Sequence, residues 1–164
     1  MPTPILPSVN NYGLWQIYFA EKIKDKLAKS TRDFLGPVTE FNISIGRFNL
    51  ATRWPHVYII HARHNIEEAN VSGGKLHAQW TYDVIVENSH PSDLDRAEKE
   101  AILVLGDVIA ELHTDPHLLV GAAWTARGMS LEFLEPVYPL DPATGDLYVQ
   151  VGLRVVILKS MQLV

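Results

Sequence analysis

The sequence contains no cysteine, which excludes disulfide-stapled scaffolds, thiolate zinc sites and cysteine nucleophiles. It also lacks long apolar runs, and none approaches the roughly 18 residues that a membrane-spanning helix requires. The N-terminal stretch MPTPILPSVN carries three prolines and no basic run ahead of an apolar core, so it does not resemble a signal peptide. We therefore expect a protein that stays in the cytoplasm where it is made and has no membrane partner.

The common catalytic and nucleotide-binding motifs are missing as well. The chain has no G-x-S-x-G elbow, no P-loop and no G-x-G-x-x-G fingerprint. The segment SGGK places a lysine beside two glycines, but it does not open a helix, and we interpret it as a hairpin loop. We therefore predict that the protein is not an enzyme and binds no cofactor.

The seven histidines of the chain raise the question of a metal site. His61 and His64 have an odd spacing, which puts them on opposite faces of a straight strand. In the segment HTDPH at 113–117, two histidines bracket an aspartate and a proline. His113 suits the negative end of a helix dipole and Pro116 cannot continue a helix, so we interpret the segment as a helix stop. No converging ligand set is apparent, and we predict no metal site.

The net charge of −5 is unevenly distributed along the chain. Residues 1–82 hold nine Lys/Arg and six Asp/Glu, a net of +3, whereas residues 83–164 hold five and thirteen, a net of −8. An acidic chain does not suggest sequence-specific nucleic-acid binding. Such segregation suits a protein that packs head-to-tail on copies of itself, and the alternative is two differently solvated faces.

The first part of the chain predicts an arm, a helix and three strands. Residues 1–10 form an extended proline-rich arm, and residues 11–164 a single domain. A helix is expected over 12–29, because apolar side chains recur every fourth residue at Trp15, Phe19, Ile23 and Leu27. Period-two patterns predict strands at 41–48, 56–64 and 76–87, with NVSGGK as a flexible connection before the last.

The second part predicts a long helix and two strands. Apolar residues at steps of three and four mark a helix over 93–113, with Ser92 as its cap and Asp95 completing a capping-box-like start. Strands follow at 123–135 and 147–157, joined by a turn rich in Pro, Asp and Gly. The order α-β-β-β-α-β-β indicates an α+β fold, a mainly antiparallel sheet of about five strands with two main helices on one face.

Two tryptophans near predicted strand starts are candidate interface residues. Trp54 and Trp124 each have an arginine within three residues, Arg53 and Arg127 respectively. Tryptophan and arginine are enriched at protein–protein hot spots. The alternative is packing in the core or at a sheet edge.

The order of elements over roughly 12–160 resembles the tail terminator (tail-completion) proteins of long-tailed bacteriophages. The segments that carry the resemblance are WPHVYIIHA, AQWTYDVIVENS, the long helix with its Asp-containing turn in DLDRAEKEAILVLGDVIAELHTDPHLLVGAAWTARGMSLEF, and the final strand LYVQVGLRVVIL. The proline-rich arm and the loop NIEEANVSGGKLH have no place in that pattern.

The resemblance implies a structural protein of the virion neck that assembles in the host cytoplasm. It implies a homohexameric ring that caps the tail tube protein, stops its polymerisation and joins the head–tail connector. Genomic DNA would pass through the ring without specific binding, which an acidic protein suits because carboxylates repel phosphates. The alternatives are another neck, head–tail connector or baseplate component, or a small α+β enzyme or ligand-binding domain.

Overall fold

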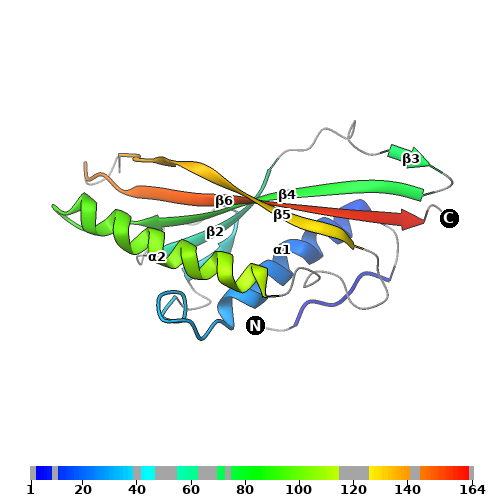
Figure 1. Cartoon of the computed structure of the whole chain (residues 1–164), viewed down its shortest axis with the longest axis horizontal. Coiled ribbons are helices and arrows are strands. Elements are labelled where there is room, and N and C mark those ends of the chain that lie inside the picture. The colour runs from blue at the N-terminus through cyan, green and yellow to red at the C-terminus, as the bar shows by residue number, and fades with distance from the viewer. Residues whose placement is uncertain are drawn as a thin grey trace.

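The computed structural model describes residues 3–8, 11–38, 42–46, 55–62, 70–72, 75–114, 126–140 and 145–162. Its elements in chain order are α1 (Tyr12–Ala28), β1 (Ile43–Ile45), β2 (His56–His61), β3 (Asn70–Ser72), β4 (Lys75–Asn88), α2 (Leu94–His113), β5 (Ala126–Val137) and β6 (Val149–Gln162) (Figure 1). The predicted α+β class is confirmed.

A mixed, mostly antiparallel sheet forms one layer of the molecule. Its main path is β1-β2-β4-β6-β5, and β3 pairs with the part of β4 that β2 leaves open. The β1–β2 pair is parallel, and the other pairs are antiparallel. Strands β4 and β6 pair along their whole length, from Lys75 opposite Gln162 to Asn88 opposite Val149. This long pair forms the centre of the sheet, with β2 and β3 beside β4 and β5 beside β6.

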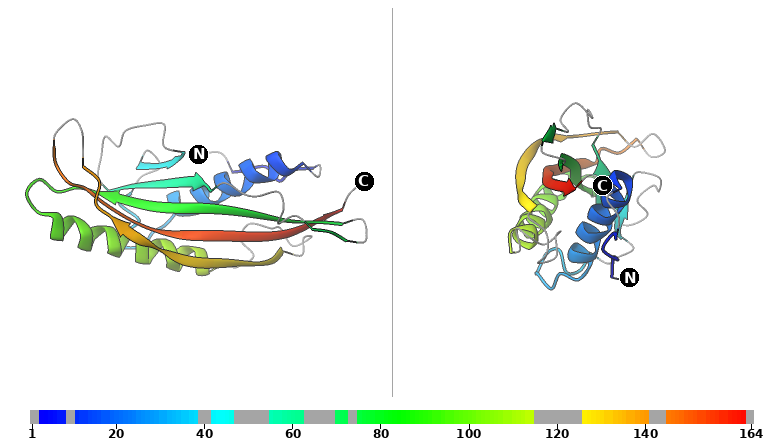
Figure 2. Two further views of the ribbon diagram at one scale, coloured as in Figure 1. Left: turned by 90° about the horizontal axis from the view of Figure 1, so that it is seen from above. Right: turned by 90° about the vertical axis from the view of Figure 1, so that its right-hand side faces the viewer.

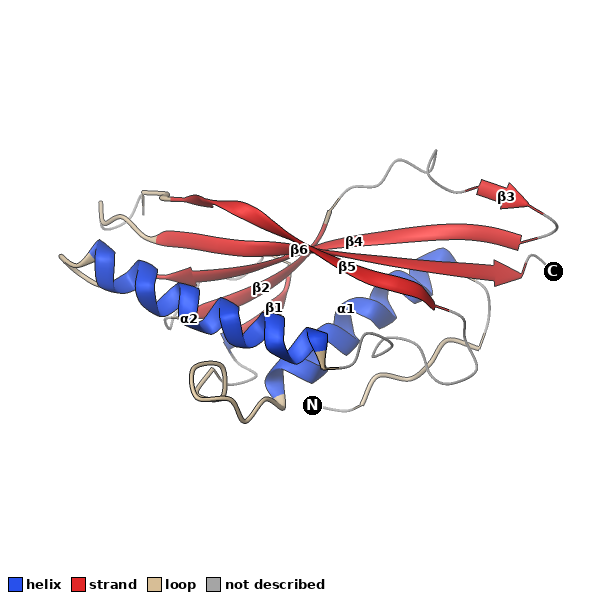
Figure 3. Cartoon of the chain, in the orientation of Figure 1, coloured by secondary structure: helices blue, strands red, loops and turns tan. Residues whose placement is uncertain are grey.

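Both helices cover the same face of the sheet, as the blue and red layers of Figure 3 and the end-on view of Figure 2 show. The alternating pattern of the central strands explains why. The apolar side chains of β4 and β6 on the face that meets the helices are buried: Ala78, Trp80, Tyr82, Val84, Val86, Val149, Val151, Leu153, Val155 and Ile157. A period of two thus gives β4 and β6 one mainly apolar face.

The two helices contribute the rest of the core. The predicted stripe of α1, which is Trp15, Phe19, Ile23 and Leu27, has no exposed surface. The Asn11 side chain accepts a hydrogen bond from the backbone amide of Leu14, so an asparagine caps this helix. Burial of the apolar faces of α1 and α2 against the sheet is the main stabilising term of the fold.

Two predictions at the margins of the sheet need correction. Of the strand expected over 41–48, the described residues 42–46 place Ile43–Ile45 in β1, and Ile45 is exposed although it was expected to share the buried face of Ile43. The connection NVSGGK includes β3, which pairs with β4 through Val71 opposite Leu76. Both errors arise at the margins of the sheet, where segments of three residues are too short to display a period.

The last two strands were predicted on the correct segments with shifted ends. β5 begins at Ala126 and extends to Val137, and β6 begins at Val149 rather than at Leu147. Leu147 lies in an isolated bridge with Leu140 and is exposed. Phe133 is 73% exposed, although its partner Leu153 is buried. Leu147 and Phe133 thus leave apolar surface uncovered.

The predicted cap of the second helix was wrong by one residue. The cap is Asp93, whose carboxylate accepts a hydrogen bond from the amide of Arg96 at 3.0 Å. Ser92 precedes it with a φ of 66°, in the left-handed region that a residue with a Cβ rarely adopts. Both residues are good cap types, so the sequence alone did not distinguish them.

Replacing Asp93 with alanine should lower the free energy of unfolding by about 1 kcal/mol, because the first turn of α2 loses its side-chain acceptor. The matched change Ser92→Gly should be neutral or stabilising by up to about 1 kcal/mol, since glycine accepts a positive φ without strain. Urea unfolding followed by circular dichroism measures both. A larger loss in Ser92→Gly than in Asp93→Ala would contradict this assignment of the cap.

Candidate interaction surfaces

The four candidate interface residues remain a prediction. Arg53, Trp54 and Trp124 lie outside the described residues. The backbone of Arg127 belongs to β5, at an irregularity in the β5–β6 register between Ala126 and Gly128, and its side chain lies outside the described part of the chain. The surfaces described below consist of other residues.

The histidines give no metal centre among the described residues, where no group of three or more His, Cys, Asp or Glu side chains is positioned to hold an ion. His113 is the last residue of α2 and is exposed. The amide of Thr114 donates to the carbonyl of Ala110, which caps the helix. Asp115 and His117 lie outside the described residues. The described part of HTDPH thus acts as a helix end.

His56 is buried on the face of the sheet opposite the helices. Its Nε2 lies 2.9 Å from the hydroxyl of Ser44, and its ring lies 4.4 Å from that of Tyr58. Burial lowers the pKa of the His56 imidazole below its ordinary value of 6.5. The folded chain therefore holds this ring neutral over a pH range in which the unfolded chain protonates it.

The unfolding free energy should consequently fall as the pH drops below about 6.5, because the unfolded state then binds the additional proton. In His56→Gln this contribution is lost, so the fall between about pH 7.5 and pH 5 should be shallower than in the wild type. Equal slopes for wild type and His56→Gln would contradict the prediction.

An exposed apolar surface lies where β5 turns into β6, and we call it the β5–β6 tip. It consists of Val137, Tyr138, Leu140 and Leu147, all exposed, together with the exposed Asp146. The tip is held by the Leu140–Leu147 bridge and by a 3.0 Å hydrogen bond from the amide of Tyr148 to the carbonyl of Pro139. The hydroxyl of Tyr138 also donates to Glu98 of α2 at 2.8 Å. Apolar side chains thus project from an anchored hairpin end.

A groove lies between the N-terminal arm and the outer side of α1, and we call it the α1 groove. It has a volume of about 670 Å³. Its lining is mostly apolar, with one charge of each sign: Thr3, Pro4, Ile5, Leu6, Pro7, Ser8, Leu14, Ile17, Tyr18, Glu21, Lys24 and Ile45.

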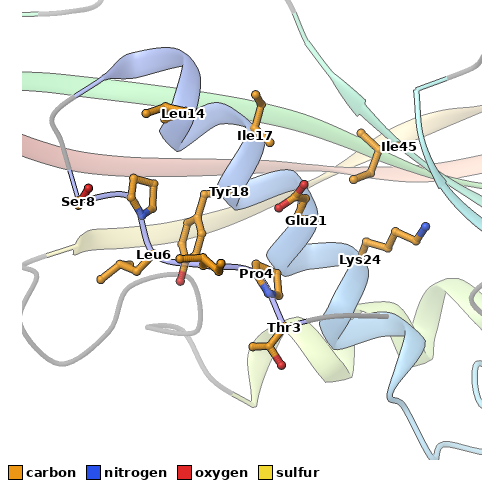
Figure 4. Close-up of a pocket in the computed structure, with 12 residues that line it drawn as sticks. Thr3, Pro4, Leu6, Ser8, Leu14, Ile17, Tyr18, Glu21, Lys24 and Ile45 are labelled. Atoms are coloured by element: carbon orange, nitrogen blue, oxygen red, sulfur yellow. The ribbon is translucent and has the colours of Figure 1, made fainter.

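Figure 4 shows how the arm forms one wall of this groove. The arm runs antiparallel to α1, with Thr3 toward the end of the helix that holds Lys24 and Ser8 toward the end that holds Leu14. A smaller hollow of about 220 Å³ shares Ile17 and Ile45 with the groove and continues toward β2 and β4. The groove is therefore a concave apolar surface on the outside of α1.

These two surfaces hold most of the exposed apolar side chains. Of the fourteen large ones in the described part of the chain, five line the α1 groove and four belong to the β5–β6 tip, with Phe133 as a further one on β5. Ile17 is 57% exposed and Leu140 is 59% exposed. Contiguous exposed apolar patches on a folded protein mark interaction sites.

The two surfaces differ in charge and in position. Residues 132–150, around the tip, contain four acidic and no basic residues, whereas residues 11–29, around the groove, contain four lysines and two acidic residues. In Figure 1 the tip lies at one end of the longest axis, and the arm with the first turns of α1 lies toward the other end. The two apolar surfaces are therefore separate, and the chain segments around them differ in net charge.

Sequence reasoning assigned these two segments as an arm and a turn but missed their surfaces. A signal was present, because Ile5 and Leu6 lie among prolines and Leu140 and Leu147 lie among Pro, Asp and Gly. Apolar side chains in segments that form no regular structure have no periodicity to place them in a core. Apolar side chains in such segments are therefore candidates for exposed contact residues.

None of the described helices combines the length and apolar composition needed to cross a membrane. Comparison with protein-family models and with curated protein sequences gives no match for this chain.

Proposed function

We propose that this chain is a structural protein of a phage neck, a tail terminator that forms a ring on the tail tube, stops its growth and joins the head connector. The observation that carries the proposal is the pair of separate apolar surfaces that the fold leaves uncovered. A protomer of a cyclic ring larger than a dimer needs two different surfaces, one for each neighbour. The β5–β6 tip and the α1 groove meet this requirement.

The fold is consistent with the resemblance on which the proposal also depends. The observed order α-β-β-β-β-α-β-β differs from the order α-β-β-β-α-β-β behind the resemblance by the three-residue strand β3. The long helix α2 follows β4, and the apolar strand β6 closes the sheet. The net charge of −5 suits a ring through which genomic DNA passes, because carboxylates do not retain phosphates. No reaction forms part of this function.

The direct test is the mass of the purified protein by light scattering, alone and with tubes of the tail tube protein from the same virus. We expect a ring of defined mass in solution, or a monomer that binds only the ends of tubes and halts their elongation. A strict monomer at high concentration that leaves tube growth unchanged would contradict the proposal. Binding at the baseplate end or on the connector alone would favour another neck or tail component.

A ligand-binding domain is the second candidate, because the volume of the α1 groove falls within the range of pockets for small molecules, about 300–1,000 Å³. The two candidates differ in what fills the groove. A ligand-binding domain would keep its affinity for an apolar fluorescent probe at any protein concentration. A ring protomer should lose probe binding as the protein assembles.

A further inference from the structure

We propose that residues 3–8 act as a strap that closes onto the outer side of α1 and fills the α1 groove of its own chain. The two sides of the groove are apolar and uncovered. Ile5 and Leu6 are exposed on the arm, and Leu14 and Ile17 are exposed on the helix. Closure brings these four side chains together and removes apolar surface on both sides from water.

The arm already lies along the surface that it covers on closing. It runs antiparallel to α1 and forms one wall of the groove (Figure 4). In the sequence, Val9 and Asn10 are the two residues that separate Ser8 from the helix cap Asn11. So short a tether gives the arm a high effective concentration at the helix, which favours it over an occupant of similar chemistry that binds from solution.

The arm is held beside α1 without polar contacts in the described part of the chain. Residues 3–8 form no hydrogen bond and no ion pair with the other described residues. Pro4 and Pro7 restrict the backbone, so the arm is extended both before and after it closes. Closure therefore breaks no hydrogen bond and costs little conformational entropy.

The charges of the groove favour an uncharged occupant. Glu21 and Lys24 both line it and lie three residues apart on α1, so their charges offset one another. The segment 1–10 contains no charged side chain. The arm therefore matches the lining in polarity, whereas an acidic or a basic partner finds no charge complementarity there.

Closure itself is a property of the isolated chain, and its consequence for assembly rests on the proposed function. A closed strap covers one of the two surfaces that a ring protomer offers to its neighbours. The apparent affinity of a neighbour for the groove is then reduced by the fraction of molecules in which the strap is open. The strap is thus an autoinhibitory contact that keeps isolated protomers apart until a neighbour displaces the arm.

The first test measures the reactivity of an introduced thiol, which is free of background because the chain has no cysteine. Ile5→Cys places the thiol on the strap at a position that is 89% exposed when the groove is open, and cysteine remains a compact apolar side chain. Ile102→Cys, at a 50% exposed position on α2, is the matched control. Each rate of reaction with a maleimide is divided by the rate of the same variant unfolded in guanidinium.

If the strap is closed in about four of five molecules, Ile5→Cys should react roughly fivefold more slowly than Ile102→Cys, although the open groove exposes it more. Adding Ile17→Ser should remove most of this protection, because the strap then loses part of the surface on which it closes. Equal rates, or a faster reaction of Ile5→Cys, would overturn the strap. Protection that grows with protein concentration would do the same, since it would assign the groove to a second copy.

The second test measures the affinity of the groove for the neutral apolar dye Nile red. The double variant Ile5→Ser with Leu6→Ser should bind the dye more tightly than the wild type, because the strap no longer competes with it. Adding Ile17→Glu should abolish this gain, which places it in the groove. A fixed wall predicts the opposite sign, so equal or weaker binding by the double variant would overturn the strap.

Both measurements use the isolated full chain, and the strap variants change exposed side chains outside the core, so their circular dichroism spectra should match the wild type. Failure of the strap therefore leaves the terminator function standing. Failure of the protein to cap tail tubes leaves the strap standing in turn.

Discussion

Replacing Trp80 with alanine should lower the free energy of unfolding by about 3–5 kcal/mol, the largest loss that we expect from one substitution. Trp80 lies in the middle of β4 and is fully buried. Its ring stacks on Tyr12 at 4.9 Å and meets Phe19 edge-on at 5.0 Å, and its indole N–H donates to the carbonyl of Tyr12 at 3.3 Å. The substitution thus removes core volume, two aromatic contacts and a hydrogen bond.

The effect of Trp80→Ala should extend to the α1 groove, because Tyr12 and Phe19 both belong to α1. Guanidinium unfolding followed by circular dichroism measures the loss of stability. Trp80→Phe is the matched control, since it keeps an aromatic ring, and it should cost less than half as much. A loss below about 1 kcal/mol for the alanine variant would show that α1 is not anchored through Trp80, because such a value is far under the usual cost of deleting a buried tryptophan.

Gly152→Ala should lower the free energy of unfolding by about 1–3 kcal/mol through overpacking. Gly152 lies in the middle of β6, between β4 and β5, and is buried. A Cβ at this position would lie 2.8 Å from the backbone oxygen of Val84 and 3.3 Å from side-chain atoms of Ile85 and Leu134. The backbone of a central strand has little freedom to move away, so the strands must separate locally.

The control for Gly152→Ala is Gly106→Ala, which makes the same chemical change on the outer side of α2. No atom lies within 4 Å of the Cβ that it introduces. It should stabilise the protein by about 0.5–1 kcal/mol, because glycine is a poor residue for a helix interior. Thermal unfolding of both variants should therefore give shifts of opposite sign. A stabilising Gly152→Ala would mean that the centre of the sheet is less tightly packed than described.

The parts of the fold that followed from the sequence are those with many repeats of a pattern. Fourteen paired residues on β4 and β6 leave no doubt about which side chains face the helices. The stripe of α1 was predicted for the same reason. The three-residue strands β1 and β3 show no period, and the choice between Ser92 and Asp93 depends on one backbone angle. Short elements are therefore decided by tertiary contacts rather than by local pattern.

The candidate surfaces were less accessible to sequence reasoning. Tryptophan and arginine are general indicators of interfaces, and they drew attention to Trp54 and Trp124, which lie outside the described residues. The surfaces that the structure offers are made of leucine and isoleucine in a proline-rich arm and in a turn. Their exposure depends on where the arm lies beside α1 and where the hairpin ends, and neither position is encoded locally. The charge split favoured a head-to-tail contact between copies of the chain, which stays a prediction.

The length of tails assembled with and without this protein is the most direct test of its role as a terminator. Electron microscopy of lysates that lack the protein should show tubes of uncontrolled length that are not joined to heads. Supplying the wild-type protein should restore the defined length and the joint. Supplying a variant with Leu14→Glu and Ile17→Glu in the α1 groove should not. Tubes of unchanged, controlled length in the absence of the protein would contradict the account.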